Sequence, residues 1–457
     1  MKAGFARLDI TPPFGTNLVG YFHQRPADDI ITPLYVNAVV VDDGERRAAL
    51  ITLDAEGATA ECTATIREYT SEMTGLDPDS IFISCIHTHQ GIGLYSLNGF
   101  NNIVKTRVAD AVQLAIYDLH EAKAYVARAE AKGVAFIRLY RMKDGSTKTN
   151  PGMPSKDKVL APIGTPDETA QLIKFKREGA SDIAIVNFQM HPDVIGGTKI
   201  CHDWPGFVRT YLEAALNDEA DGKGVKAICF NGAQGDTAHI DRTRLSEGIL
   251  PKWGGVAHSK HIARVIVGAL IGAYTYAKEV NSDKVFYKRQ PVIINSATKP
   301  TPEQLEIAYK VRDAYNAGVE KAKAEGRSEW DGGNEAVKDF PFGLVPARRF
   351  ISLSKEPDTY TLYLSSVGFG DVCFVGFPGE PFTEIGRQTK AQSPFAMTFP
   401  CCMTNGQEGY FPMKEVFGDV NGYEASATFF EMGAAEKLMA AAIDLTKEMQ
   451  NAGKNEE

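Results

Sequence analysis

Short apolar runs alternate with amphipathic stretches along the sequence, and this alternation restricts the possible folds more than any other feature. Six apolar runs have the length of β-strands, at residues 35–41, 48–53, 80–85, 183–188, 227–230 and 372–377. Apolar residues at helical spacing mark further stretches, at residues 103–119, 205–216, 259–276 and 434–449. Strands interleaved with helices are typical of a layered α/β fold, and strands without polar alternation indicate a sheet covered on both faces. We therefore predict a mixed β-sheet flanked by helices.

The length of 457 residues would allow two or three domains, but no linker divides the sequence. We expect one domain over residues 1–457, with a helical excursion around residues 301–345. Thr301 followed by Pro302 is a helix start signal at the beginning of that excursion. Residues 326–342 are polar and rich in glycine, which predicts an exposed loop.

The charge balance and the distribution of apolar residues exclude several classes of protein. Lys and Arg number 49 against 58 Asp and Glu, a formal net charge of −9, whereas nucleic-acid binders carry a basic surface. No apolar run approaches the roughly 18 residues of a membrane-spanning helix. The first residues lack the apolar core of a secretory signal, so we expect a cytoplasmic protein, or a secreted or periplasmic one if the chain was trimmed. A monomer and a homo-oligomer are both compatible with the sequence.

Histidine is scarce, with nine in the chain, and its placement is therefore informative. His87 and His89 come directly after the apolar run that ends at residue 86, and their spacing places both side chains on one side of an extended chain. His191 follows the apolar run that begins at residue 183. In open α/β sheets, ligands bind at the carboxyl ends of the strands. We therefore expect these two strand ends to bring imidazoles to one edge of the sheet.

Two further strand ends carry polar or small residues. Glu380 follows the run at 372–377 behind a Pro-Gly turn, and the run at 227–230 leads into NGAQGD at 231–236. The small residues of that segment let a ligand approach the backbone N–H groups. Two imidazoles and a carboxylate with an open position are a ligand set that a catalytic zinc uses. The motifs GxGxxG, GxxxxGK[ST], HExxH and GxSxG are absent, which removes the motif support for a nucleotide-binding fold or a serine nucleophile.

Each of these features also has an interpretation without a metal. A histidine after a strand can be a hydrogen-bonded core residue, a Glu in a loop can be solvated, and a Gly-rich segment can be a plain turn. Cys85, two residues before His87, could act as a nucleophile, but its apolar surroundings in the sequence favour a buried, inert thiol. The seven cysteines form no CxxC motif and are expected to be reduced and mostly buried.

Seven motifs in chain order resemble the neutral ceramidase family, the zinc-dependent amidases that release fatty acid from N-acylsphingosine. They are DITPP at 9–13, HTHQG at 87–91, NFQMHP at 187–192, NGAQGD at 231–236, FPGEPF at 377–382, NGQEGY at 405–410 and GYEAS at 422–426. Each motif is short, but the ordered set extends from residue 3 to about residue 435. The resemblance implies that most of the chain forms the catalytic domain of such an enzyme.

Carried onto this sequence residue by residue, the resemblance implies three groups of site residues. The zinc ligands fall on His87, His191, Glu380 and Tyr410. The catalytic residues fall on His89 and Arg138 beside the metal and on Tyr423 facing the substrate carbonyl. We expect His89 to act as general base or acid, because imidazole titrates near neutrality, and Arg138 or Tyr423 to stabilise the oxyanion. Substrate contacts are expected at Asp203, Gly235, Asp236 and Ala238.

The sequence departs from the family pattern in two places. In ceramidases the Gly-Asp turn continues into a Ser-Pro that contacts the substrate, whereas here Asp236 is followed by Thr237, Ala238 and His239, with Ala238 at the serine position. The chain stops at Glu457, so we expect no C-terminal immunoglobulin-like domain. The resemblance therefore supports the metal chemistry more strongly than ceramide as the substrate.

The resemblance implies a zinc-dependent hydrolase that cleaves an N-acyl amide bond with a metal-activated water, with Zn²⁺ as its cofactor and a small-molecule or lipid-like substrate. The alternative is a zinc enzyme of the same fold that acts on a non-lipid substrate such as a sugar conjugate or small ester, since no basic amphipathic helix or lipidation motif indicates membrane docking. A third interpretation is a non-catalytic metal-binding or glycan-binding module. The complete set of ligand positions argues against that third interpretation.

Overall fold

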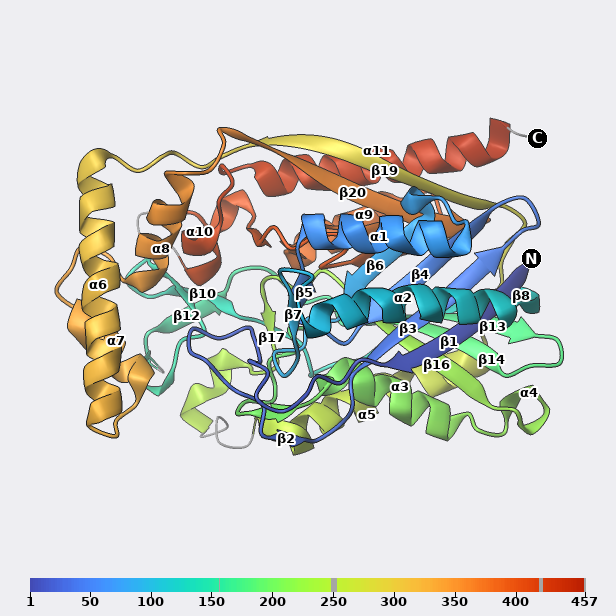
Figure 1. Ribbon diagram of the computed structural model, residues 1–457, viewed down its shortest axis with the longest axis horizontal. Coiled ribbons are helices and arrows are strands. Elements are labelled where there is room, and N and C mark those ends of the chain that lie inside the picture. Colours follow the sequence, from blue (N-terminus) through green and yellow to red (C-terminus); the bar gives the residue numbers. More distant parts are fainter. Residues whose placement is uncertain (156, 248–252, 419–421, 456–457) are drawn as a thin grey trace.

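The computed structural model describes residues 1–155, 157–247, 253–418 and 422–455, and it confirms the predicted layered α/β fold (Figure 1). Nine strands of the described chain form the larger sheet. Its order is β16 (Val225–Asn231), β14 (Asp182–Phe188), β13 (Thr169–Arg177), β8 (His120–Glu130), β1 (Lys2–Asp9), β3 (Tyr35–Asp42), β4 (Arg47–Leu53) and β6 (Ile81–Cys85), with β18 (Lys278–Glu279) beside β8. The pairs β14–β16 and β4–β6 are parallel and the other pairs are antiparallel, so the sheet is mixed.

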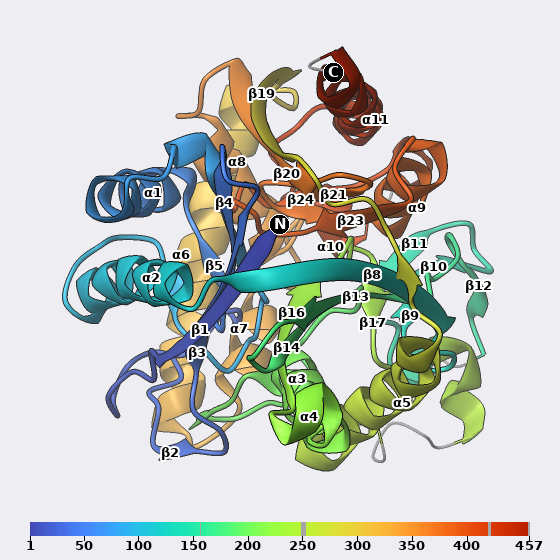
Figure 2. The same ribbon diagram turned by 90° about the vertical axis from the view of Figure 1, so that its right-hand side faces the viewer.

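A second, four-stranded sheet packs on one face of the larger sheet (Figure 2). Its order is β19 (Val285–Asn295), β20 (Thr359–Phe369), β21 (Val372–Gly376) and β23 (Met397–Cys401). Phenylalanines fill the space between the two sheets. The ring of Phe374 lies 6.1 Å from that of Phe82 and 5.5 Å from that of Phe230, both in the larger sheet. Such edge-on and tilted aromatic pairs add stability beyond the area they bury.

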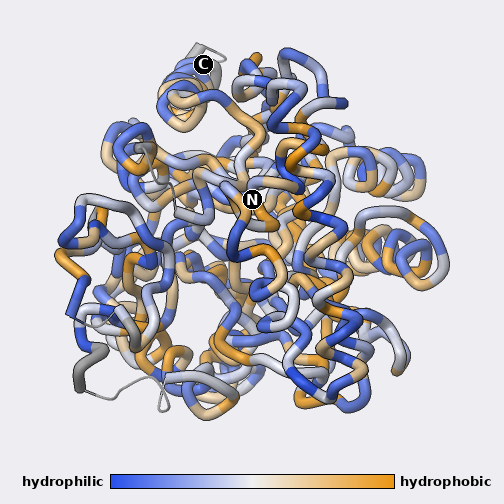
Figure 3. Tube along the Cα trace, turned by 90° about the vertical axis from the view of Figure 1, so that its left-hand side faces the viewer, coloured by the Kyte–Doolittle hydropathy of each residue, from blue (hydrophilic) through white to orange (hydrophobic). Residues whose placement is uncertain are grey.

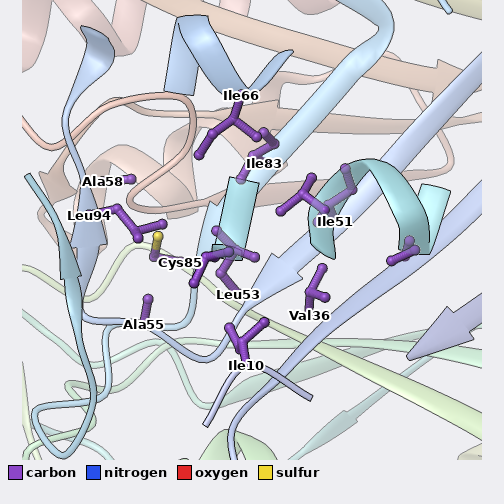
Figure 4. Close-up of a cluster of buried hydrophobic side chains, with 14 of the residues drawn as sticks. Ile10, Val36, Ile51, Leu53, Ala55, Ala58, Ile66, Ile83, Cys85 and Leu94 are labelled. Atoms are coloured by element: carbon purple, nitrogen blue, oxygen red, sulfur yellow. The ribbon is translucent and has the colours of Figure 1, made fainter. Parts of the chain in front are cut away.

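Strand β3 shows why the predicted strands are apolar along their whole length. Val36 and Val40 belong to a hydrophobic cluster under α1 (Ala60–Thr74) and α2 (Phe100–Tyr117), whereas Val39 and Val41 belong to the cluster between the sheets. Successive side chains of a strand point to opposite faces, and here both faces are covered. Figure 4 shows part of the cluster under α1 and α2, with side chains that include Val36, Ile51, Leu53 and Ile83.

Further helices complete a four-layer arrangement. Helices α3 (Asp203–Ala215) and α5 (Gly255–Thr275) cover β13, β14 and β16, and α9 (Thr383–Gln392) and α11 (Ala434–Asn455) cover the outer face of the second sheet (Figure 2). The helices predicted at 103–119, 205–216, 259–276 and 434–449 correspond to α2, α3, α5 and α11. Within the described residues, no helix has the length and apolar character that crossing a membrane requires.

The helical excursion lies between β19 and β20, at one end of the molecule (Figure 1). It consists of α6 (Pro302–Ala324), α7 (Glu329–Val337) and α8 (Leu344–Leu353), and Thr301 caps α6 with a capping box. The three helices share a hydrophobic cluster of their own, and Figure 3 shows hydrophilic and hydrophobic residues interleaved along the chain at this end. That residues 1–457 form one domain stays a prediction.

The exposed loop predicted at residues 326–342 is wrong, because α7 occupies part of that range. Ser328 caps the helix by accepting a hydrogen bond from the backbone N–H of Asp331. Two glycines allow α7 to approach α6 closely: a Cβ on Gly332 would lie 2.3 Å from the Cβ of Ala322, and a Cβ on Gly333 would lie 2.5 Å from the ring of Tyr315. These glycines therefore serve helix packing.

All seven cysteines lie within the described residues, and all are buried and unpaired. Cys85 has no exposed surface, and burial raises the pKa of its thiol far above the ordinary value. A thiolate, the nucleophilic form of cysteine, is therefore strongly disfavoured at this position. This finding weighs against the cysteine-hydrolase interpretation.

Candidate metal centre

β6 and β16 are the first and last strands in the order of the larger sheet. Their carboxyl ends are joined by hydrogen bonds to each other and to a third segment. The side-chain amide of Asn231 at the end of β16 donates to the carbonyl of Ile86, 3.3 Å away, just after β6. The backbone N–H of Cys402 donates to the carbonyl of Asn231 at 3.1 Å, and the hydroxyl of Ser84 in β6 donates to the carbonyl of Cys402 at 2.9 Å. The carboxyl ends of three strands, β6, β16 and β23, are thereby brought together.

Three imidazoles form the centre of the site. His87 follows β6 and His191 follows β14, as the sequence predicted, and His89 lies between them. The Nε2 atom of His89 is 3.4 Å from Nε2 of His87 and 3.1 Å from Nε2 of His191. All three side chains are buried, and a ligand atom from each lies within 4.8 Å of the others. Three buried imidazoles at these distances could hold a metal ion.

Glu380 contributes a carboxylate to the same centre. Its Oε2 lies 3.4 Å from Nε2 of His87 and 3.6 Å from Nδ1 of His191, and it accepts a hydrogen bond from Nε2 of Gln234 at 3.1 Å. Glu380 is in β22 (Glu380–Pro381), which pairs in parallel with β24 (Tyr410–Phe411), so that Glu380 and Tyr410 are direct neighbours in the register. The structure thus brings the four residues predicted as zinc ligands to one place, and their role as ligands is a proposal developed below.

The imidazole of His87 is fixed by contacts on its far side. Its Nδ1 lies 2.7 Å from the carbonyl oxygen of Glu56, so that Nε2 faces the centre. Burial lowers the pKa of His87, but the carboxylates of Glu380 and Glu56 outweigh this effect and raise it to about 9. The φ angle of His87 is +68°, an uncommon conformation that is often found at functional sites. The hydroxyl of Tyr95 and the side-chain amide of Gln407 both donate to the Glu56 carboxylate.

Arg138 lies between β9 (Phe136–Ile137) and β10 (Leu139–Met142) and connects several parts of the site. Its Nε donates to Oε1 of Glu424 at 2.5 Å, its Nη1 is 3.2 Å from Nδ1 of His191, and its guanidinium carbon is 5.2 Å from the ring centre of Tyr410. Its Nη2 is buried and has no hydrogen-bond partner within the described residues. A buried donor without a partner is costly, so this nitrogen is available for a bound group.

Tyr410 and Tyr423 face each other beside the carboxylate of Glu380. Their ring centres are 5.6 Å apart, and Tyr423 begins the short helix α10 (Tyr423–Ala427). Burial, reinforced by Glu380, raises the pKa of Tyr423 to about 12 and that of Tyr410 well above its ordinary value. Both phenols are therefore protonated near neutral pH unless a cation is bound next to them.

His89 is covered by a loop near the N-terminus that the sequence did not indicate as part of the site. Burial, followed by the nearby His87, lowers the pKa of His89 to about 3, and its Nδ1 is buried without a partner within the described residues. The ring of Tyr21 packs edge-on against it, with ring centres 5.5 Å apart, and Nη2 of Arg25 donates to its carbonyl at 2.5 Å. A Cβ on Gly20, whose φ is +92°, would lie 2.5 Å from Nδ1 of His89, so the loop needs glycine there.

Of the four residues predicted to contact substrate, Asp203 and Asp236 form hydrogen bonds with neighbouring segments of the protein. The carboxylate of Asp203 accepts hydrogen bonds from the backbone N–H groups of residues 194, 195 and 204 and from the hydroxyl of Ser259. The carboxylate of Asp236 accepts from the backbone and hydroxyl of Thr383 at the start of α9. Both carboxylates are thus occupied by protein groups, and their roles toward a substrate stay predictions.

Gly235 and Ala238 lie closer to the metal centre. A Cβ on Gly235 would be 2.5 Å from the carbonyl oxygen of Glu380, so this glycine permits the approach of the β22 backbone. Ala238 is in β17 (Thr237–Ala238), which pairs with β9 directly before Arg138. Thr237 accepts a hydrogen bond from the backbone N–H of His191 at 3.2 Å. The segment therefore forms one wall of the centre.

An aromatic rim connects the centre with the helical excursion. Phe22 is stacked on Trp330 of α7, with ring centres 5.4 Å apart, and packs edge-on against Tyr423 at 6.1 Å. Phe22 and Trp330 are 38% and 45% exposed. A cavity of about 90 Å³ lies beside them and is lined by polar as well as apolar side chains, among them His23, Asn316, Glu329 and Arg348.

Sequence reasoning missed Glu56, Tyr21 and Asp193 as parts of the site. A signal existed for Glu56, which comes three residues after the predicted strand at 48–53, in the same position relative to a strand end as the residues that were recognised. Asp193 comes two residues after His191 and interacts electrostatically with both His191 and His89. Tyr21 lies in a loop without a local pattern, and only the fold places it near His89.

The donor set fits a zinc ion. Imidazole nitrogens, a carboxylate and a phenol oxygen are N and O ligands of the kind that zinc binds, and the carboxylate and imidazoles already lie at the distances of a compact cluster. The unpartnered Nη2 of Arg138 is in addition a buried donor available to a further group at the centre.

No model of a protein family matches the sequence, and no curated protein matches it. Solved structures do resemble the chain. The neutral ceramidase from Pseudomonas aeruginosa superposes with a TM-score of 0.68, covering 98% of this chain and 73% of that one at 14% sequence identity. A ceramidase complexed with C2 superposes with a TM-score of 0.69, covering 100% of this chain and 75% of that one, also at 14% identity.

The chain has a neutral ceramidase-like fold. This finding confirms the resemblance predicted from the ordered motifs at the level of the fold. At 14% identity, the comparison establishes the architecture, and the chemistry of this chain has to be argued from its own residues. Within this fold, three buried imidazoles and a neighbouring carboxylate at the strand ends form a group that could hold a metal ion.

Proposed function

We propose that this protein is a zinc-dependent hydrolase that cleaves an N-acyl amide bond by means of a metal-activated water. The observation that carries the proposal is the cluster of His87, His89 and His191 with the Glu380 carboxylate 3.4 Å and 3.6 Å from two of the imidazoles. His87, His191, Glu380 and Tyr410 would hold the zinc ion. When bound in such a site, zinc lowers the pKa of a water and polarises a carbonyl group, so no serine nucleophile is required and Ala238 is tolerated.

The remaining residues act on protons and charge. His89 is neutral near pH 7, since burial lowers its pKa to about 3, and it can accept a proton at Nε2 from the attacking water. The unpartnered Nη2 of Arg138 is available to stabilise negative charge on the carbonyl oxygen of the substrate. The phenol of Tyr423 retains its proton near neutral pH and can donate to the same oxygen. Glu424 keeps Arg138 in place by accepting from its Nε at 2.5 Å, and the hydroxyl of Thr149 in turn donates to the other carboxylate oxygen of Glu424 at 2.7 Å.

Metal analysis of purified variants tests the assignment of ligands. We expect about one zinc ion per chain in the wild type, and loss of both zinc and hydrolysis in His191→Ala and Glu380→Ala. The His89→Ala variant distinguishes two roles of His89. If His89 is a base, the variant should retain zinc and lose turnover; if His89 is a ligand, the variant should lose zinc as well. A His191→Ala protein with stoichiometric zinc would refute the ligand set.

A second candidate function is hydrolysis of a non-lipid substrate, such as a sugar conjugate or a small ester. The observation that favours it is the presence of polar side chains, among them Arg348 and Glu329, in the lining of the cavity beside Phe22 and Trp330. A hydroxylated group could form hydrogen bonds with these polar side chains, whereas an alkyl chain would leave them without partners. Short N-acyl amides, ceramide, esters and glycosides should be compared as substrates, and release of fatty acid from ceramide would exclude this second candidate.

A further inference from the structure

An aspartate and a histidine outside the predicted ligand set form a pair beside the metal centre. Nδ1 of His239 lies 3.4 Å from Oδ1 of Asp193. Both atoms are buried, and neither has another hydrogen-bond partner within the described residues. The two side chains are 11% and 24% exposed.

The pair is tied to the centre by the backbone on both sides. Asp193 comes two residues after His191, and its carboxylate interacts electrostatically with His89, His191 and Arg138. His239 directly follows β17. The hydroxyl of Thr237 in β17 accepts a hydrogen bond from the backbone N–H of His191. Ala238 of β17 pairs with Phe136, the first residue of β9, which comes two residues before Arg138. The pair therefore lies on the wall formed by β17.

The geometry of the pair orients the imidazole. With Nδ1 directed at a carboxylate, the proton of a neutral His239 resides on Nδ1, and Nε2 is the free ring nitrogen. The ring of His258 packs 5.6 Å away, and its Nε2 lies 3.3 Å from the carbonyl of His239, which limits movement of the segment.

Hydrolysis of an amide requires a proton for the leaving nitrogen as well as a base for the water. His89 is one proton-transfer group, and its Nε2 faces the other two imidazoles. A second imidazole on the adjacent wall, held by a carboxylate, meets the requirement for the leaving side.

We propose that His239 is a second catalytic residue, which protonates the leaving amine, and that Asp193 is its positioning residue. This inference rests on the proposed amide hydrolysis. In the step, the C–N bond of the tetrahedral adduct breaks, its electron pair goes to nitrogen, and the proton on Nε2 of the charged His239 forms the new N–H bond, so that a neutral amine leaves. His239 then recovers a proton from solvent, which balances the proton that His89 takes from the attacking water.

Dependence on the leaving group tests the proposal with the full chain. Wild type, His239→Gln, His239→Ala and Asp193→Asn are compared on an N-acyl alkylamine, whose leaving nitrogen needs a proton, and on a 4-nitrophenyl ester of the same acid, whose leaving group does not. We expect kcat for the amide to fall about 100-fold or more in both His239 variants and about tenfold in Asp193→Asn. The ester rate should change by less than about threefold, and bound zinc should be unchanged.

A matched control exists at the other end of the larger sheet. His120 and Asp118 also form a pair, with 3.9 Å between Nδ1 and Oδ1, but this pair is at the start of β8 and is about one-third exposed. His120→Gln should leave both rates unchanged. Equal losses on amide and ester, or loss of zinc, in the His239 variants would assign them a structural role and overturn the proposal, as would an unchanged amide rate. A wild-type protein that hydrolyses neither substrate would instead refute the proposed function, and the inference with it.

Discussion

Arg138 and Glu424 form an ion pair that is buried on both sides, with 2.5 Å between Nε and Oε1 and side chains that are 5% and 0% exposed. The two residues are 286 positions apart in the sequence. The pair joins the strand connection between β9 and β10 to α10, and so places Tyr423 beside Tyr410 and the guanidinium of Arg138 beside His191.

Glu424→Gln should destabilise the protein strongly. The substitution keeps the shape of the side chain but leaves the buried charge of Arg138 without its counter-ion, a loss of about 3–5 kcal/mol in comparable pairs. Urea denaturation would measure the decrease in the free energy of unfolding. The exposed pair of Lys310 and Glu306 on α6 provides a control, and Glu306→Gln should leave the midpoint unchanged. Equal midpoints for wild type and Glu424→Gln would contradict the structural role of the pair.

Gly235→Ala should weaken metal binding. The added Cβ would lie 2.5 Å from the carbonyl oxygen of Glu380, so the β22 backbone must move away and carry the carboxylate with it. Zinc affinity measured by competition with a chromogenic chelator should decrease about tenfold or more. Gly268→Ala in the middle of α5 is the matched control, since no atom lies within 4 Å of its added Cβ. The control should retain zinc and gain roughly 0.5–1 kcal/mol of stability.

Removal of the metal should lower the thermal stability of the wild type. Without a cation, the Glu380 carboxylate and the three imidazoles remain buried together, and a ligand present at 1,000 times its Kd contributes about 4 kcal/mol to the free energy of unfolding. Calorimetry after dialysis against a chelator, and again after addition of zinc, measures the difference. The same treatment should not alter the unfolding of Glu380→Ala, and a chelator-insensitive wild type would speak against a metal centre.

Acid should destabilise the protein partly through His202. Burial, followed by the charge of Arg209, lowers the pKa of His202 to about 4, whereas in an unfolded chain it is about 6.5. As the pH falls, the unfolded state thus takes up the proton first. The contribution of His202 to the free energy of unfolding, up to about 3 kcal/mol, is therefore complete above pH 6.5 and is lost as the pH falls toward 4. Denaturation curves at pH 7 and 4.5 should show a smaller difference for His202→Gln than for the wild type. Identical differences would contradict the prediction.

Trp330→Ala should change substrate affinity without changing the metal. Trp330 is stacked on Phe22, which contacts Tyr423, so the substitution removes the outer part of the aromatic rim while His87, His191 and Glu380 stay in place. We expect KM to rise about tenfold, with zinc content and kcat close to wild type. Trp204, which is fully buried in the core, offers a contrast: Trp204→Phe should lower stability and leave KM unchanged.

The sequence predicted those parts of the site that depend on local pattern. His87, His191 and Glu380 each lie within three residues of the end of an apolar run, and the apolar runs are visible because both faces of these strands are covered. The predicted strands and the main helices were recognised for the same reason. The ordered motifs added Tyr410 and Tyr423, which no periodicity would have indicated.

The remaining parts depend on contacts between distant segments. Tyr21 meets His89 only because a loop folds back over the sheet edge, and Asp193 and His239 are joined across 46 positions by the pairing of β17 with β9 and by the hydrogen bond from His191 to Thr237. Gly332 and Gly333 led to a wrong expectation because glycine has the same appearance in a sequence whether it serves a turn or the close approach of two helices.

The excursion begins and ends at one end of a long antiparallel pair, where Asn295 of β19 is paired with Thr359 of β20 and the N–H of Ser296 bonds to the carbonyl of Asp358. Its entry and exit points are therefore neighbours, held together by the hairpin itself. Residues 297–357 can therefore vary in length without a shift in the register of the second sheet, provided that α8 keeps its packing against α10, which carries Tyr423 and Glu424. The hairpin thus anchors the module that carries Trp330 of the aromatic rim, while His87, His191 and Glu380 lie on segments outside it.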